Sequence, residues 1–89
     1  RIKILEAFAH GKPVVSTSLG IEGIEAVAER DFLLAETAAE FIRQISRLME
    51  DPELRERLAG NARRLWAGSY MPERLPELLA DTSTRLKAI

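Results

Sequence analysis

The sequence contains no cysteine and only one histidine among its 89 residues. Without cysteine there is no disulfide framework and no thiolate metal site, which agrees with a cytosolic protein. The single histidine and the lack of a clustered aspartate pair leave no constellation of metal ligands. No signal peptide is recognisable, and no apolar run approaches the roughly 20 residues that a transmembrane helix needs. We therefore expect a soluble, cytoplasmic protein.

A strong charge of one sign is also lacking. Thirteen basic and fourteen acidic residues nearly cancel, which leaves neither a basic field for nucleic acid nor an acidic tail. The stretch RERLAGNARR (residues 55–64) is predicted to be an exposed charged face with local ion pairs, not a nucleic-acid patch. Hydrophobic residues make up 46% of the chain, a normal share for a packed protein. A chain of 89 residues forms at most one domain, residues 1–89.

The chain opens with a predicted helix over residues 1–10, whose apolar pattern leaves little polar surface. We expect most of this helix to be buried, and Glu6 stands out in it as a carboxylate that would be buried with it. Gly11 ends the helix and Pro13 prevents its continuation. No Ser, Thr, Asp or Asn precedes Arg1 as a cap, so the chain is expected to begin inside this helix or at its start.

Two short apolar runs are predicted to be strands. Residues 14–17 are mostly β-branched and do not alternate with polar residues, which is typical of an interior strand in a parallel sheet. Gly20 and Gly23 mark a turn-rich loop. Residues 24–29 are predicted to form a short helix or a turn, and residues 31–36 a second strand.

Three helices with stronger signals follow. Thr37 and Glu40 are spaced as a capping box, in which each side chain accepts a backbone N–H of the other. Asp51 is the predicted N-cap of the next helix, with Pro52 in its first turn. Pro72 opens the last helix. The apolar residues expected to face inward are Ala38, Phe41, Ile42, Ile45, Leu48 and Met49 in the first helix, Leu54, Leu58, Ala62, Leu65 and Trp66 in the second, and Leu75, Leu78, Leu79 and Leu86 in the third.

The predicted fold class is α/β, with about two parallel strands and about four or five helices. Two parallel strands cannot build a sheet that is covered on both faces, and these helices carry more apolar surface than two strands can cover. We therefore expect either the C-terminal portion of a larger α/β domain or a chain that completes its core by oligomerising.

Two sequence blocks resemble one enzyme family. RIKILEAFAHGKPVVSTSLGIEG (residues 1–23) resembles the donor-binding segment of GT-B fold glycosyltransferases of the retaining family 4 type (glycosyl transferases group 1). LMEDPELRERLAGNARRL (residues 48–65) is similar to the Leu-x-x-Asp-Pro-x-x-Arg-x-x-Leu segment of that family and occurs in the same order. The resemblance implies the C-terminal half of a Rossmann-like, nucleotide-sugar-binding GT-B domain. The parent enzyme would transfer a sugar from a nucleoside-diphosphate sugar to a hydroxyl acceptor in polysaccharide biosynthesis.

The same resemblance implies a second, N-terminal domain that carries most of the acceptor site and is not in this sequence. We therefore expect the chain to be catalytically inactive alone. Residues 72–89 would form the helix that crosses back to brace the N-terminal domain, and an apolar face exposed there would favour self-association. In the parent enzyme a peripheral position at the membrane is expected.

At matching positions, the resemblance implies that Glu6 is the second glutamate of the Glu-x7-Glu motif of the family and binds the donor ribose. A carboxylate has acceptors only, which suits paired ribose hydroxyls. The first glutamate, which contacts the donor sugar, falls before Arg1, so no catalytic residue is assigned to this chain. Arg1 and Lys3 are candidates for phosphate contact, with an ordinary surface role as the alternative. Thr17 and Gly20 follow the carboxyl end of a predicted strand, where α/β sheets bind ligands; a plain tight turn is the alternative.

No metal or other cofactor is expected, because the family stabilises the leaving nucleotide by a helix dipole and basic side chains, and no Asp-x-Asp metal motif is present. Two other functions stay open. The chain would suit a small standalone interaction module that binds a partner through its apolar stripes. A GT-B fold nucleotide-sugar epimerase would keep the fold and change the chemistry.

Overall fold

The computed structural model describes residues 2–70, and it has the predicted α/β fold with two parallel strands. The helix predicted for residues 72–89 lies outside the described residues. The elements in chain order are α1 (Ile2–Ala9), β1 (Val15–Ser16), α2 (Ser18–Ile21), β2 (Leu33–Leu34), α3 (Ala38–Glu50), α4 (Pro52–Leu65) and the π-helical turn η1 (Trp66–Tyr70).

The two strands form a small parallel ladder. Val15 pairs with Leu33 and Ser16 with Leu34. Each strand contributes only two residues, fewer than the sequence predicted. The parallel direction is confirmed, so the carboxyl ends of β1 and β2 lie at the same edge of the ladder.

The connection between the strands differs from the prediction in one place. It begins with α2, a single helical turn, where a loop was expected. The turn predicted at Gly23 is confirmed. Its φ of 86° is a left-handed conformation that glycine adopts without strain. Of the two alternatives for residues 24–29, the turn is observed: Arg30 N–H donates to the carbonyl of Val27 at 3.1 Å, and Ala28 makes an isolated parallel bridge with Phe32.

The end of α1 is fixed by a Schellman motif. Lys12 N–H donates to the carbonyl of Ala7 at 2.9 Å, and Gly11 N–H donates to that of Phe8 at 3.1 Å. These two bonds require a left-handed residue after the helix, and Gly11 supplies it with a φ of 67°. The helix end predicted at Gly11 and Pro13 is therefore confirmed.

The predicted caps of α3 and α4 are confirmed as well. Thr37 Oγ1 accepts the N–H of Glu40 at 3.1 Å, and the Glu40 carboxylate accepts the N–H of Thr37 at 3.2 Å. Asp51 Oδ1 accepts the N–H of Leu54 at 3.0 Å, and Pro52 occupies the first turn of α4. These caps satisfy backbone donors that have no partner inside a helix.

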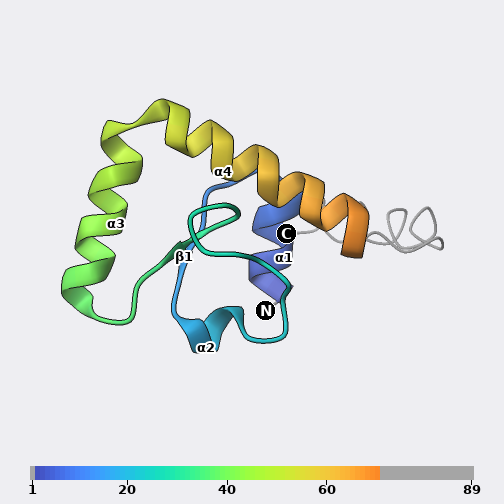
Figure 1. The fold of residues 1–89 in the computed structure, drawn as a ribbon, viewed down its shortest axis with the longest axis horizontal. Coiled ribbons are helices and arrows are strands. Elements are labelled where there is room, and N and C mark those ends of the chain that lie inside the picture. The colour runs from blue at the N-terminus through green and yellow to red at the C-terminus, as the bar shows by residue number, and fades with distance from the viewer. Residues whose placement is uncertain (1, 71–89) are drawn as a thin grey trace, which may run out of the picture.

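The core consists of two clusters that both include α4. Figure 1 shows α4 lying beside α1 and meeting α3 at a corner, with β1 between them. The buried members are Phe8, Ile21, Phe32 and Ala62 in the first cluster and Leu33, Leu54 and Leu58 in the second. The predicted inner face of α4 is therefore confirmed for its buried positions.

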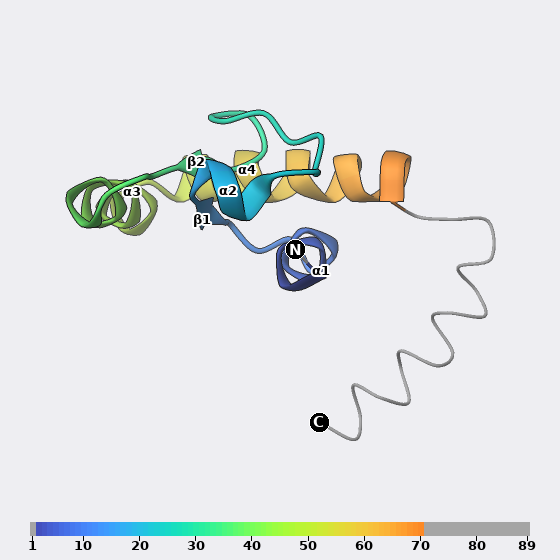
Figure 2. The same ribbon diagram turned by 90° about the horizontal axis from the view of Figure 1, so that it is seen from below.

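The expectation that α1 is mostly buried is wrong. Phe8 is its one buried residue, Ile2 is 73% exposed and Glu6 is also exposed. The reason is that, among the elements of residues 2–70, α1 packs mainly against α4 and η1. Figure 2 shows α1 on one side of the strands with no other described element beyond it.

The apolar stripe expected to face inward on α3 is only partly covered: Phe41 and Leu48 are half-buried, and Leu48 packs against the second core cluster. None of the residues of α3 is buried, and Ile42, Ile45 and Met49 are 68%, 47% and 75% exposed. The cause is the small size of the sheet: α3 contacts the two short strands and α4, which together cannot cover a helix of 13 residues.

The local ion pairs predicted for residues 55–64 do not form within α4. Arg55 instead donates to the last carbonyls of α3, Arg57 donates to the carbonyl of Glu29, and Arg64 donates to the side chain of Asn61. The guanidinium groups of Arg55 and Arg57 thus join α4 to other elements, because a guanidinium presents several donors in a fixed fork.

Candidate functional site

The candidate site lies where the strands end and α1 begins. The start of α1 and the whole of α2 lie at the same end of the molecule in Figure 1, and both face the viewer in Figure 2, which is seen from that end. This is the carboxyl edge of the parallel strands, since α2 directly follows β1. Open α/β sheets bind ligands at this edge.

The α1 side of the site is the Lys3 end of a shallow depression of about 400 Å³. This depression runs along α1 as far as Lys12, and it is lined by Lys3, Glu6, Ala7, His10 and Lys12. Neither the Glu6 carboxylate nor the Lys3 ammonium has a hydrogen bond or ion pair with another residue of the 2–70 segment. The expectation of a buried Glu6 is wrong, but an exposed carboxylate keeps its acceptors available to a ligand. Arg1 lies outside the described residues.

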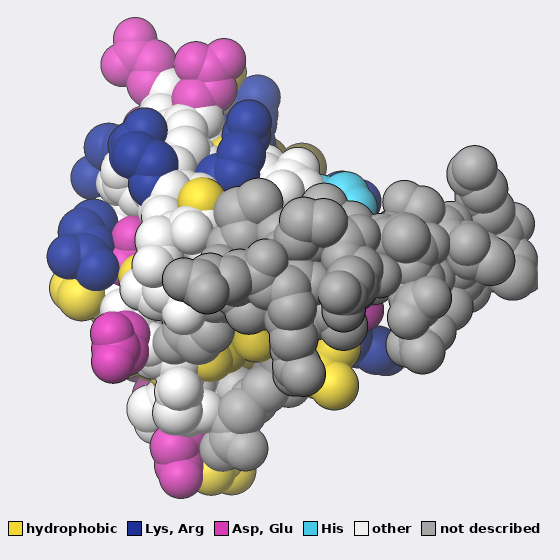
Figure 3. Space-filling view, turned by 90° about the vertical axis from the view of Figure 1, so that its right-hand side faces the viewer, with side chains coloured by type: hydrophobic (Ala, Val, Ile, Leu, Met, Phe, Trp, Pro, Cys, Tyr) yellow, Lys and Arg dark blue, Asp and Glu magenta, His cyan; other side chains and the backbone are white. Residues whose placement is uncertain are grey.

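His10 closes the far end of this depression and caps α1. Its Nδ1 lies 2.8 Å from the carbonyl oxygen of Glu6. The ring is at the surface, as the cyan side chain in Figure 3 shows, and several Lys and Arg side chains gather on the upper part of the same face. The lining of the depression thus combines the carboxylate of Glu6, which can accept hydrogen bonds, with the positively charged ammonium groups of Lys3 and Lys12.

The α2 side of the site is closed by its own hydrogen bonds. Thr17 Oγ1 accepts the N–H of Gly20 at 2.9 Å, so these two predicted site residues are paired with each other. A Cβ at Gly20 would meet Ser16 Oγ at 2.6 Å, so a larger residue here would require the Ser16 side chain to move. The structure places Thr17 and Gly20 at the expected edge, in a helical turn rather than an open loop.

A residue that the sequence analysis missed, Glu36, joins the ends of the two strands. Its carboxylate accepts the N–H of Ser18 at 2.7 Å and the hydroxyl of Ser18 at 2.7 Å. The hydroxyl bond and then the amide bond hold the pKa of Glu36 below its ordinary value. The available signal was its position as the last residue of the second predicted strand, residues 31–36, at the same edge as Thr17.

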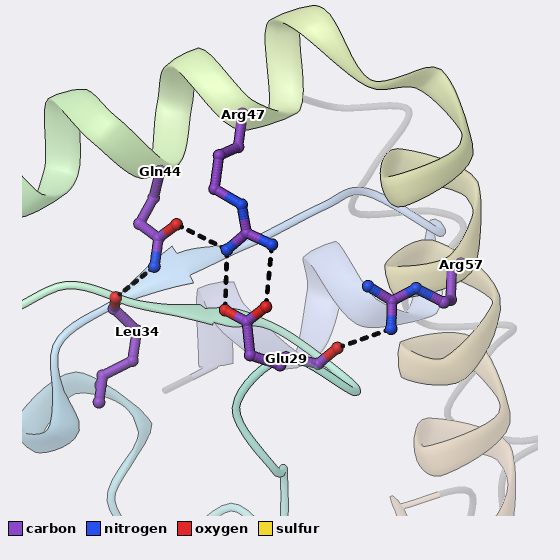
Figure 4. Close-up of polar contacts among 5 residues, drawn as sticks. All are labelled: Glu29, Leu34, Gln44, Arg47 and Arg57. Carbon is purple, nitrogen blue, oxygen red and sulfur yellow. Dashed lines mark hydrogen bonds and ion pairs between the residues drawn. The ribbon is translucent and has the colours of Figure 1, made fainter.

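A polar cluster at the amino end of β2, opposite this edge, joins the β1–β2 connection to α3 and α4 (Figure 4). Arg47 of α3 donates both terminal nitrogens to the two carboxylate oxygens of Glu29, each at 2.9 Å, and this bond lowers the pKa of Glu29. Arg57 of α4 donates to the carbonyl of the same residue at 3.1 Å. Glu29 has a left-handed φ of 71°, so these bonds hold a conformation that costs a non-glycine residue energy. Gln44 adds a bond to the Leu34 carbonyl at 2.9 Å.

The loop before β2 also contains a buried carboxylate with a structural role. Asp31 is 2% exposed, and its Oδ2 accepts the N–H of Val27 at 2.8 Å and Nε of Arg30 at 2.9 Å. Asn61 of α4 donates to the carbonyl of Arg30 at 2.7 Å. These contacts are made within the loop and to α4, so they shape the approach to β2.

The site offers binding chemistry. The carboxylate of Glu6 can accept bonds from hydroxyl groups, and the ammonium groups of Lys3 and Lys12 can attract an anion. Within residues 2–70, no three His, Cys, Asp or Glu side chains are grouped to hold a metal ion. The arrangement therefore suits a ligand that carries both hydroxyl groups and negative charge.

Comparison with known proteins gives one match. A family model described as glycosyl transferase-like matches residues 1–80, which include the whole candidate site and the helices α1 to α4 of the described segment. No curated protein and no solved structure matches the chain. Within the described segment, no helix has the length and apolar character that crossing a membrane requires.

Proposed function

Because the chain belongs to the glycosyl transferase-like family, we propose that it binds a nucleoside-diphosphate sugar. A glycosyltransferase would transfer the sugar of this donor onto a hydroxyl acceptor. The family match over residues 1–80 carries this proposal. A nucleoside-diphosphate sugar has the two properties that suit the site, since its ribose presents hydroxyl donors and its diphosphate is an anion.

In this proposal Glu6 accepts the ribose hydroxyls and Lys3 attracts the diphosphate. The support is geometric: both residues line one depression on α1, and neither is paired with another described side chain. The positive end of the α1 dipole lies on the same side as Lys3, near the start of the helix, and adds to the attraction for an anion. Arg1 would add a second basic group, and Thr17 and Gly20 would border the ligand from the edge of β1.

We further propose that the chain is the C-terminal part of a GT-B donor domain of the retaining family 4 type. The exposed stripe of Ile42, Ile45 and Met49 supports this, because further strands of the same sheet would cover it. The acceptor site would belong to an N-terminal domain, so the chain alone is expected to transfer no sugar. Residues 72–89 would brace that domain. The parent would act in polysaccharide synthesis without a divalent ion.

The test is a titration of the chain with UDP, GDP and ADP, each with and without EDTA. We expect one nucleotide to bind and Glu6→Gln to weaken it by about 1–3 kcal/mol, the range for a hydrogen bond to a charged group. Glu50→Gln is the matched control, because Glu50 is an exposed helical carboxylate on α3, away from the depression. EDTA should leave the affinity unchanged. Equal affinities of the two variants would remove Glu6 from the ligand site.

One observation favours a second function. The exposed apolar stripe of α3 would also suit an interaction module that binds a partner protein. That function predicts no nucleotide binding and a loss of partner binding on Ile45→Asp. Binding of a nucleotide that depends on Glu6 would decide for the donor site.

A further inference from the structure

The bond between Glu36 and Ser18 links two segments that are 18 residues apart in the sequence. Ser18 is the first residue of α2, and Glu36 follows β2 by two positions. Both donors of Ser18, the amide and the hydroxyl, go to the two different oxygens of one carboxylate, each at 2.7 Å. Bonds of this length to a charged acceptor are among the stronger ones in proteins.

Glu36 is itself held in place by α3. Its own N–H donates to Oε1 of Glu40 at 2.6 Å, and the same oxygen accepts the N–H of Thr37 at 3.2 Å. Glu40 and Thr37 form the capping box of α3. The N-terminus of α3, Glu36 and the first turn of α2 therefore form one continuous hydrogen-bonded chain.

On this geometry we propose that Glu36 is a positioning residue for the donor site: it holds Ser18, and through it α2 with Thr17 and Gly20, against the carboxyl edge of β1. This inference rests on the proposed function, because it assigns Glu36 a part in donor binding. In this role Glu36 acts through Ser18, whose amide and hydroxyl each donate to one oxygen of its carboxylate. Because its pKa is lowered by these bonds, the carboxylate stays charged to a more acid pH than an isolated glutamate.

The experiment uses the full 89-residue chain and the nucleoside diphosphate that binds it, among UDP, GDP and ADP. Three variants are compared with the wild type: Glu36→Gln, Ser18→Ala and the double variant, with Glu50→Gln as control. Affinity is measured well below the melting temperature of each variant, and hydrogen exchange of the Ser18 amide reports the local bond. A residue with only a structural role would change the melting temperature and leave the affinity of the folded protein unchanged.

We expect Glu36→Gln to speed Ser18 exchange and to weaken nucleotide binding by roughly 3- to 10-fold, as loss of a typical hydrogen bond would. In the Ser18→Ala background the effect of Glu36→Gln on affinity should be smaller, because the two changes act on the same contact. Faster exchange with unchanged affinity would overturn the role of Glu36, while a loss of binding on Glu6→Gln would still support the donor site. A wild-type chain that binds none of the three nucleotides would overturn both.

Discussion

Glycine-to-alanine substitution is predicted to change the free energy of unfolding in opposite directions at Gly11, after α1, and at Gly60, inside α4. Gly11 has a φ of 67°, and a Cβ placed on it would meet Nη2 of Arg63 at 2.2 Å. Gly60 lies inside α4, and its Cβ would meet Arg64 no closer than 3.6 Å, an ordinary contact. The same change, glycine to alanine, is therefore strained at one position and free at the other.

The magnitudes follow from the backbone. A left-handed conformation costs a residue with a Cβ about 1–2 kcal/mol. Arg63 is exposed, so its guanidinium can move aside from a Cβ at Gly11 at small cost. Gly11→Ala should therefore lower the free energy of unfolding by about 1–2 kcal/mol. Gly60→Ala should raise it by about 0.8–1 kcal/mol, the difference in helix propensity between the two residues.

The assay is urea denaturation of the full chain, followed by circular dichroism at 25 °C. The two variants should shift the midpoint in opposite directions with the same m-value. A Gly11→Ala variant combined with Arg63→Ala separates the two causes, since it removes the steric contact and keeps the backbone strain; it should remain destabilised. A Gly11→Ala chain as stable as the wild type would refute the left-handed end of α1.

The remaining predictions concern the core and the response to acid. Leu58 of α4 is fully buried against Leu33 of β2, so Leu58→Ala should lower the free energy of unfolding by about 2–5 kcal/mol. Ile42→Ala, on the exposed stripe of α3, should lower it by less than about 1 kcal/mol. Similar losses at both positions would contradict the core assignment. The bond from Arg47 lowers the pKa of Glu29, so its contribution is full above the ordinary value of 4.5 and is lost as pH falls through the lowered value. Because both side chains are about half exposed, the Arg47–Glu29 pair should add only about 0.2–1 kcal/mol to the free energy of unfolding. Glu29→Gln should remove this part of the loss of stability that melting curves show from pH 7 to pH 3. An unchanged acid response in the variant would argue against the pair.

Local signals in the sequence were sufficient for the helix ends. The capping box at Thr37, the N-cap at Asp51 and the glycine stop at Gly11 each depend on residues within one helical turn, and all three are confirmed. The parallel strands were also predictable, because their β-branched and aliphatic composition points to a shared core. Their lengths were not, since pairing depends on the partner strand.

The sequence alone did not predict which helix faces are buried or which polar residues far apart in the chain form hydrogen bonds. An apolar pattern shows which face of a helix is suited to burial but not whether another element covers it. The predicted burial was therefore wrong for Glu6 and for the Ile42, Ile45 and Met49 part of the α3 stripe. The bonds from Ser18 to Glu36 and from Arg47 to Glu29 each join residues 18 positions apart. Such pairs come together only when the β1–β2 connection and α3 are folded around the strands.

The central claim is that the start of α1 and the carboxyl edge of β1 form one nucleotide-binding site. The most direct test is a titration of the ¹⁵N-labelled chain with UDP, GDP and ADP, followed by the backbone amide signals. The claim predicts that one nucleotide shifts the signals of Lys3, Glu6, Ser18 and Gly20 together, with a single dissociation constant, and leaves those of α3 unchanged. Shifts confined to α3, or no shifts with any of the three nucleotides, would contradict it.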